Sequence, residues 1–180
     1  GYLAGGVLPV AKHFPGLGDT LADSHLDLTV AQSGDSSREK DLLPYREAVA
    51  AGAPAVMTAH LLVPQWDDLP ATLSAVALRG WLRQRLGFKG VIITDDLEMK
   101  GIAQLLPPAQ AGRKALLAGA DLLLICNNRE AVWDAVRVLE EAGDPAESFR
   151  ESADRLKRLR QALPPQQSGL EEVKKYFGFS

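Results

Sequence analysis

The residues best suited to chemistry in this chain are three histidines, a lysine and several aspartates. They are Lys12, His13, Asp23, His25, His60, Asp95 and Asp96. A carboxylate together with an Asp–His pair supplies a nucleophile and a proton donor, the two groups that glycosyl transfer requires. Aspartate and histidine also bind divalent metals, but Asp23-x-His25 on a glycine-rich loop is not a recognised metal-binding spacing. The residue types therefore favour a polar, hydrogen-bonding substrate and no metal.

Short apolar runs alternate with longer amphipathic segments, and these elements must position the polar residues. The apolar runs cover residues 7–11, 55–59, 90–94 and 121–125, and the helical patterns cover 42–51, 74–86, 109–118 and 130–142. Each run has the length of a strand that is buried on both faces. Strand followed by helix, four times over, predicts an α/β fold of parallel βαβ units. Four such units form either a small open sheet or half of a (β/α)8 barrel.

The polar residues come where the predicted strands end. Lys12 and His13 close the first run, His60 follows the second, and Asp95 and Asp96 close the third. Ligands of parallel α/β folds gather outside the carboxyl ends of the strands, so we expect these side chains to meet at one rim. All three histidines of the chain follow predicted strands. This placement indicates a functional site independently of any family.

The composition argues against several other classes of protein. A chain of 180 residues is long enough for one domain with a substantial core. Its formal net charge of -3 and pI near 5.6 argue against a nucleic-acid-binding surface, and it has no run of about 18 or more apolar residues that would span a membrane. The single cysteine, Cys126, excludes a disulfide within the chain. The first residues lack the pattern of a signal peptide, so we expect a cytoplasmic protein.

Three blocks of sequence resemble the motifs of the family 3 glycoside hydrolases, in the order in which that family carries them. They are Lys12-His13-Phe14-Pro15-Gly16-x-Gly18 followed by Asp23-Ser24-His25, then Val56-Met57-Thr58-Ala59-His60, then VIITDDLEMKG from Val91 to Gly101. The resemblance covers residues 1 to 130. Asp23-Ser24-His25 is similar to a signature of the β-N-acetylglucosaminidase branch. The resemblance implies a (β/α)8 barrel that acts on sugars.

The resemblance also implies a role for each matching residue. Asp95 corresponds to the nucleophile that forms a covalent glycosyl-enzyme. His25 corresponds to the acid/base, and Asp23 to the partner that orients its ring. Lys12 and His13 correspond to residues that bind sugar hydroxyl groups.

Three further residues of the motifs have interpretations that do not involve the substrate. His60 is either a substrate-binding residue or a hydrogen-bonded structural one, and Met99 either lines the sugar site or packs in the core. For Asp96 we favour a strand-end carboxylate that caps the next helix or bonds nearby backbone. No cofactor is expected at the site.

The chain departs from the family pattern in two ways. Leu17 stands where the family usually has a histidine, and the motifs belong to the last four βα units of an eight-stranded barrel. We therefore expect residues 1–145 to form strands five to eight and residues 146–180 to form a C-terminal helical extension packed on the barrel. The expected partner is the missing N-terminal half of the barrel. Residues 1–180 alone are expected to show little or no glycosidase activity.

The favoured function is retaining removal of terminal β-N-acetylglucosamine from small sugars, such as peptidoglycan turnover fragments or chitin oligomers. The alternatives are a β-glucosidase or glycoside phosphorylase of the same family, and a non-catalytic sugar-binding fragment. Phosphorolysis stays open because a histidine that has given up its proton is neutral and repels phosphate less than a carboxylate would. The expected partners are N-acetylglucosaminides, with no nucleic acid and no membrane.

Overall fold

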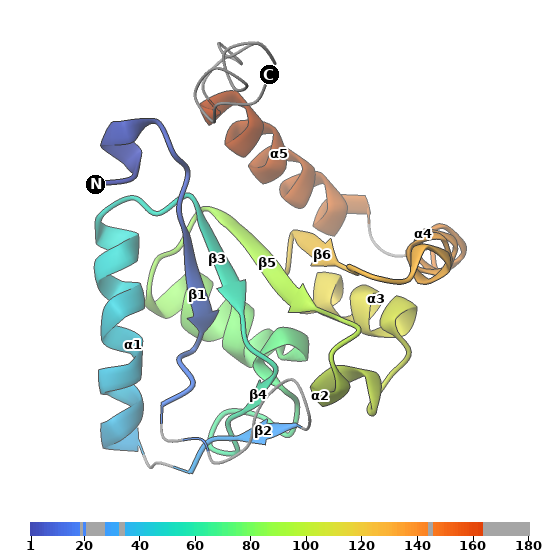
Figure 1. The fold of residues 1–180 in the computed structure, drawn as a ribbon, viewed down its shortest axis with the longest axis horizontal. Coiled ribbons are helices and arrows are strands. Elements are labelled where there is room, and N and C mark those ends of the chain that lie inside the picture. The colour runs from blue at the N-terminus through green and yellow to red at the C-terminus, as the bar shows by residue number, and fades with distance from the viewer. Residues whose placement is uncertain (19, 21–27, 33–34, 144–145, 164–180) are drawn as a thin grey trace, which may run out of the picture.

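The computed structural model describes residues 1–18, 20, 28–32, 35–143 and 146–163. Its centre is a parallel sheet of four strands in chain order, namely β1 (Val10–Phe14), β3 (Ala55–Thr58), β5 (Val91–Asp96) and β6 (Leu122–Leu124) (Figure 1). The pairs Val10–Ala55, Val56–Ile92 and Ile93–Leu122 set the register. Parallel neighbours that follow one another in the chain each need a crossover connection. The predicted α/β class with a parallel sheet is confirmed.

Helices supply these crossovers and cover one face of the sheet. They are α1 (Asp35–Ala50) between β1 and β3, the 3-10 turn η2 (Ala71–Leu73) and the π-helix η3 (Val76–Arg85) between β3 and β5, and α2 (Lys100–Ala103) and α3 (Pro108–Ala118) between β5 and β6. Another 3-10 turn, η1 (Leu3–Gly5), precedes β1. The main core packs Phe14, Val56 and Ile92 of the sheet against buried residues of these helices, including Leu42 and Leu82. The crossovers therefore fix the strands from one side.

The opposite face of the sheet is contacted by the last described helix. After β6 the chain forms α4 (Arg129–Glu141) and then α5 (Ala146–Ala162). Leu156 and Leu159 of α5 pack against Ala55, Val91 and Ile93. Strand side chains alternate between the two faces, so these three residues point away from the helices of the main core. The sheet is thus buried on both faces near the amino-terminal ends of β3 and β5.

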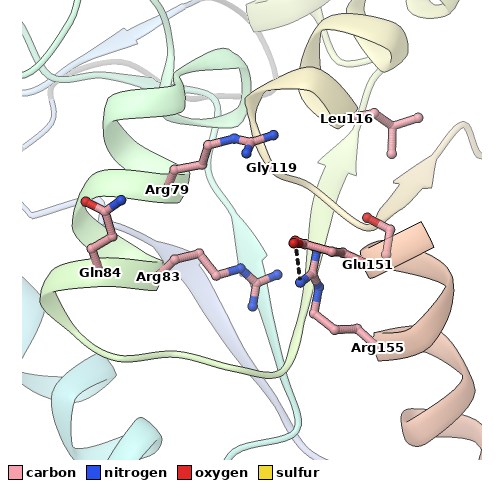
Figure 2. Close-up of a pocket in the computed structure, with 8 residues that line it drawn as sticks. Arg79, Arg83, Gln84, Leu116, Gly119, Glu151 and Arg155 are labelled. Atoms are coloured by element: carbon pink, nitrogen blue, oxygen red, sulfur yellow. Dashed lines mark hydrogen bonds and ion pairs between the residues drawn. The ribbon is translucent and has the colours of Figure 1, made fainter. Parts of the chain in front are cut away.

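A buried carboxylate, Asp121, joins several of these elements just before β6. Its oxygens accept hydrogen bonds from the Ile92 backbone N–H at 2.8 Å, Arg83 Nη2 at 2.6 Å, Arg155 Nε at 2.8 Å and Ser152 Oγ at 2.8 Å. Figure 2 shows Arg83 and Arg155 extending toward one another from η3 and α5, beside a hollow of about 340 Å³. The ion pairs of Asp121 therefore hold η3, β5 and α5 together.

A second, two-stranded sheet forms where β1 and β3 lead out of the main sheet. Its strands β2 (Thr29–Val30) and β4 (Leu61–Leu62) run parallel. Ala31, Ala59, Leu61 and Val63 form a small core of their own beside them. The sequence does not predict this sheet, because two-residue strands show no periodicity.

Aromatic rings fill the space between β1, α1 and η3. Trp66 and Trp81 stack with ring centroids 4.3 Å apart and planes inclined by 16°. Phe14 contacts Tyr45 edge to face at 5.3 Å, and the Arg85 guanidinium lies 4.0 Å above the Trp81 ring. Such contacts stabilise the fold in addition to the burial of the rings' apolar area.

The first predicted strand is wrong by three residues. The sequence places it at residues 7–11, whereas β1 runs from Val10 to Phe14. Val7 is largely exposed, and pairing begins only where Val10 meets Ala55. Lys12 and His13 therefore lie inside the strand rather than at its end. Helix α1 likewise begins at residue 35 rather than at residue 42. The sequence does not predict its first turns, because they are polar and carry no apolar stripe.

Gly90, directly before β5, is a position where a methyl group does not fit. A Cβ atom there would lie 2.3 Å from the Pro54 carbonyl oxygen and 2.7 Å from the Phe88 ring. Gly90→Ala is expected to lower the free energy of unfolding by about 1–3 kcal/mol, measured by urea denaturation. The control is Gly80→Ala inside η3, where the new Cβ meets nothing within 4 Å and a gain of about 0.5–1 kcal/mol is expected. Equal effects of the two changes would contradict the prediction.

Candidate active site

His13 and Asp95 are brought together near the carboxyl ends of β1 and β5, each one residue before the last residue of its strand. His13 Nε2 lies 3.7 Å from Asp95 Oδ2, and the two side chains are 29% and 22% exposed. A carboxylate at this position is open to a ligand and faces the His13 imidazole. The arrangement suits a nucleophile at the rim that the sequence predicts.

The backbone of Asp96 fixes one oxygen of the Asp95 carboxylate. The Asp96 N–H donates to Asp95 Oδ1 at 2.9 Å, so Oδ2 is the oxygen directed toward His13. The Asp96 carbonyl in turn accepts the Met99 N–H at 3.0 Å. The geometry of Asp95 therefore depends on how Asp96 is held.

The side chains of Asp96 and Glu98 tie the end of β5 to the loop after β6. Asp96 Oδ1 accepts the N–H groups of Glu98 at 3.1 Å and Cys126 at 3.3 Å, the backbone-bonding role that the sequence favours. Glu98 accepts the N–H groups of Asn127 at 2.6 Å and Asn128 at 3.0 Å. The Asn127 N–H lowers the pKa of the Glu98 carboxyl. Nothing in the sequence signals Glu98, because it lies on a turn and its partners are distant in the chain.

His60 lies just after β3 in a buried network of hydrogen bonds. The residue is 1% exposed, its Nδ1 lies 2.9 Å from Thr72 Oγ1, and its Nε2 lies 2.9 Å from the Asp96 carbonyl oxygen. Thr72 Oγ1 also lies 2.8 Å from Thr58 Oγ1. Both ring nitrogens are thus engaged within the protein. These partners differ from the predicted substrate contact and match the structural alternative.

Burial lowers the pKa of His60 below its ordinary value, although the Asp96 carbonyl and the carboxylates of Asp95 and Asp96 oppose this effect and His13 adds to it. The unfolded chain therefore binds a proton more readily, and the stability that neutral His60 provides is complete above pH 6.5 and is lost as the pH falls below it. His60→Gln is expected to flatten the pH dependence of the unfolding free energy between pH 7.5 and 5.5, by at most about 1.4 kcal/mol per pH unit. An equal change in the free energy of unfolding between pH 7.5 and 5.5 in the two proteins would contradict this.

Lys12 lies on a different side of β1 from the His13–Asp95 contact. It is exposed and borders a hollow of about 480 Å³ together with Gly16, Lys40 and Asp41. The loop after β1 is held there, because Arg38 donates to the Gly16 carbonyl at 3.1 Å and pairs with Asp41 at 2.9 Å. Gly16 and Gly18 have positive φ angles of 101° and 54°.

The remaining predicted residues are placed as follows. Met99 is half-buried at the start of α2, beside the end of β5. Asp23 and His25 lie outside the described residues. The hollow beside Arg83 and Arg155 is at the other end of the sheet, and both guanidinium groups are engaged in ion pairs with Asp121. We therefore place the candidate site at Asp95 and not at that hollow.

Within residues 1–18, 20, 28–32, 35–143 and 146–163, no group of three or more His, Cys, Asp or Glu side chains is placed to hold a metal ion. Over the same residues, no helix combines the length and the apolar character needed to cross a lipid bilayer.

Known proteins resemble this chain in sequence and in fold. A Beta-hexosaminidase from Thioalkalivibrio sulfidiphilus is 40% identical over 145 residues, which are 81% of this chain and 42% of that protein. A Beta-hexosaminidase from Nitrosospira multiformis is 43% identical over 132 residues, which are 73% of this chain and 38% of that protein. The solved structure of a glycoside hydrolase family 3 beta-N-acetylglucosaminidase from Paenibacillus superposes with a TM-score of 0.87 at 36% identity, covering 93% of this chain and 34% of the other.

The chain thus spans about two fifths of the length of the curated relatives it matches. The model of the glycosyl hydrolase family 3 N-terminal domain matches residues 1–159. That range contains the His13–Asp95 contact and the network of His60. The resemblance read from the motifs is confirmed, and the chain belongs to glycosyl hydrolase family 3.

Proposed function

We propose that this chain supplies the catalytic rim of a retaining β-N-acetylglucosaminidase, with Asp95 as the nucleophile. The observation that carries the proposal is the partly exposed Asp95 carboxylate near the end of β5, with His13 Nε2 3.7 Å from its Oδ2. Family membership and relatives named Beta-hexosaminidase support the substrate class. A carboxylate held by one backbone N–H keeps its second oxygen for attack on carbon.

The proposed reaction proceeds in two displacements. Asp95 Oδ2 attacks the anomeric carbon of a terminal β-N-acetylglucosamine and forms the glycosyl-enzyme, while the bond to the aglycone oxygen breaks and that oxygen takes the proton of His25. Neutral His25 then takes a proton from a water molecule, whose oxygen attacks the anomeric carbon and releases Asp95. Two inversions leave the product with the β configuration. Asp23 orients the ring of His25 and stabilises its protonated form.

Lys12, His13 and Met99 are the proposed substrate-binding residues of this site, whereas His60 lies in the hydrogen-bonded network behind it. The role of His13 is supported by its contact with Asp95. Its Nε2 lies 3.7 Å from Asp95 Oδ2, so the imidazole is close enough to bind a hydroxyl group of a sugar bonded to that oxygen. For Lys12 the proposal requires its flexible side chain to turn toward the rim, since it is exposed.

We further propose that residues 1–145 form the second half of a (β/α)8 barrel and that residues 146–180 are a C-terminal extension. The four strands lie in chain order and are joined by helical crossovers, as consecutive strands of such a barrel are. β1 and β6 are the two outer strands of the sheet, and both would pair with strands of the other half. The rim is then complete only when that half is present, and residues 1–180 alone should show little or no turnover.

The test is covalent trapping in the natural protein that contains this chain. A 5-fluoro-N-acetylglucosaminyl fluoride keeps the 2-acetamido group of the proposed substrate and slows both displacements by destabilising the positively charged transition state. Its good leaving group lets the first displacement occur. Peptide mass spectrometry should then find the label on Asp95. The matched control is Asp134→Asn, which changes an exposed carboxylate on α4 and should leave labelling intact. A label on another residue, or intact sugar binding with no label, would refute the proposed role.

A further inference from the structure

We infer that His60 is a positioning residue that holds Asp95 in place through the backbone of Asp96. The inference rests on the proposed function, because it assigns a part in the reaction to a side chain that does not meet the substrate. His60 is 1% exposed, and it lies between the end of β3 and the end of β5. Those two strand ends carry the rim.

The contacts of His60 fix which ring nitrogen carries the proton. Nε2 lies 2.9 Å from the Asp96 carbonyl oxygen, and a carbonyl oxygen only accepts, so Nε2 must be the donor. In the neutral ring Nδ1 is then an acceptor, and the Thr72 hydroxyl shares its hydrogen between Nδ1 and the Ala59 carbonyl oxygen, each at 2.9 Å. The Thr58 hydroxyl at 2.8 Å donates to Thr72 in turn. Hydrogen bonds therefore run in one direction from Thr58 of β3, through Thr72 and His60, to Asp96 of β5.

This series of hydrogen bonds ends on the carbonyl of Asp96, the residue whose N–H supports the nucleophile. The Asp96 carbonyl accepts from both His60 Nε2 at 2.9 Å and the Met99 N–H at 3.0 Å. The N–H of the same residue donates to Asp95 Oδ1 at 2.9 Å. Two donors on the carbonyl restrict rotation of the Asp96 backbone, and that restriction sets the direction of the Asp95 carboxylate. Without His60, the Met99 N–H would be the one donor left to the Asp96 carbonyl among the described residues.

The network has a second complete arrangement, which requires a charge. Thr72 Oγ1 lies 2.9 Å from the Ala59 carbonyl. If Nδ1 were protonated, it would donate to Thr72, and the Thr72 hydroxyl would turn to Ala59. Burial disfavours that charged ring, as the lowered pKa of His60 reflects. Charged groups that face His60 are Asp95, Asp96 and His13. The neutral arrangement is therefore the one that holds Asp96.

The test compares His60→Leu with His60→Gln in the natural protein that contains this chain. Leu removes the donor, whereas the Gln amide keeps an N–H near the position of Nε2. We expect kcat to fall about 10- to 100-fold in His60→Leu, the size typical of a small misplacement of a reacting group. The Kd for N-acetylglucosamine should change less than about twofold, since no direct contact is lost. His60→Gln should recover most of the lost kcat.

Direct binding of the sugar by His60 predicts another pattern, in which the Kd for N-acetylglucosamine rises together with the loss of kcat. That pattern would overturn the inference, and so would an unchanged kcat in His60→Leu. Should His60→Leu fail to fold, Thr72→Val and Thr72→Ser test the same chain of hydrogen bonds. Val should lower kcat without changing the Kd, and Ser should retain most of the activity because it keeps the hydroxyl.

A measurement on the resting protein separates this inference from the proposed function. The ¹⁵N chemical shifts of the His60 ring should show a proton on Nε2 and none on Nδ1 at pH 7.5. A protonated Nδ1 with a bare Nε2 would overturn the inference whatever the activity. If the expected tautomer is found but Asp95 takes no label from the fluoro sugar, the proposed function fails and the geometry around His60 stands.

Discussion

Asp95→Asn is expected to abolish glycoside turnover by the natural protein that contains this chain. The amide is close in shape to the carboxylate and offers the Asp96 N–H an oxygen acceptor in place of Oδ1, but it is a poor nucleophile and carries no charge. Loss of a covalent nucleophile typically costs about 10⁴-fold or more in kcat. The measurement is the release of a chromogenic aglycone from a β-N-acetylglucosaminide.

Chemical rescue makes this prediction specific to nucleophilic catalysis. Asp95→Gly opens space for a small anion, and azide should restore release of the aglycone and give an α-glycosyl azide, because one inversion replaces two. Asp134→Asn should retain full activity and show no response to azide, since Asp134 is paired on the surface with Arg137. Full turnover by Asp95→Asn, or a β-glycosyl azide from Asp95→Gly, would contradict the assigned role.

Asp121→Asn is expected to produce the largest loss of stability of any single change considered. The Asp121 side chain is fully buried and is paired with Arg83 at 2.6 Å and Arg155 at 2.8 Å. Its removal leaves Arg83 without this partner in a largely buried site and leaves Arg155 with the exposed Glu151 at 3.4 Å. Breaking a buried ion pair in this way costs about 3–5 kcal/mol. Urea denaturation of the chain, followed by circular dichroism, would measure the loss.

A matched control for Asp121 is available on the surface. Asp134→Asn breaks an exposed ion pair with Arg137, and surface pairs contribute about 0–1 kcal/mol. Arg83→Met combined with Arg155→Met in the Asp121→Asn protein should recover part of the lost stability, because it removes the unpaired charges. A loss below about 1 kcal/mol for Asp121→Asn would show that the cluster does not join α5 to the sheet.

The parts of the fold that the sequence predicts are those with a local signal. The apolar run at 55–59 is one residue longer than β3, and the helical patterns at 109–118 and 130–142 each lie within one residue of α3 and α4. Ser74 and Gly87 flank η3 closely, since Ser74 Oγ accepts the Ala77 N–H at 3.1 Å and Gly87, with a φ of 71°, follows its C-cap Leu86. Capping residues act on their own neighbours, and so the sequence displays them.

The parts that the sequence does not predict depend on contacts between distant residues. Thr72 carries no motif, yet its hydroxyl contacts His60 and Thr58 because η2 lies beside the end of β3. The grouping of His13 with Asp95 follows from the order of the strands and is predictable, whereas the 3.7 Å separation is not. Likewise, Asp121 is in the sequence simply the first residue of an apolar run. Its ion pairs and hydrogen bonds become visible only once α5 packs beside it.

The stacked pair of Trp66 and Trp81 gives this protein a built-in spectroscopic reporter. The chain has three tryptophans, and the third, Trp133 on α4, is 62% exposed. Two indoles with centroids 4.3 Å apart couple their electronic transitions, so folding should give a near-ultraviolet circular dichroism signal that vanishes when η3 separates from the segment carrying Trp66. Acrylamide should quench Trp133 first and leave the stacked pair emitting at shorter wavelength. Loss of packing at the main core and binding events at the surface of α4 thus become separately visible without any attached label.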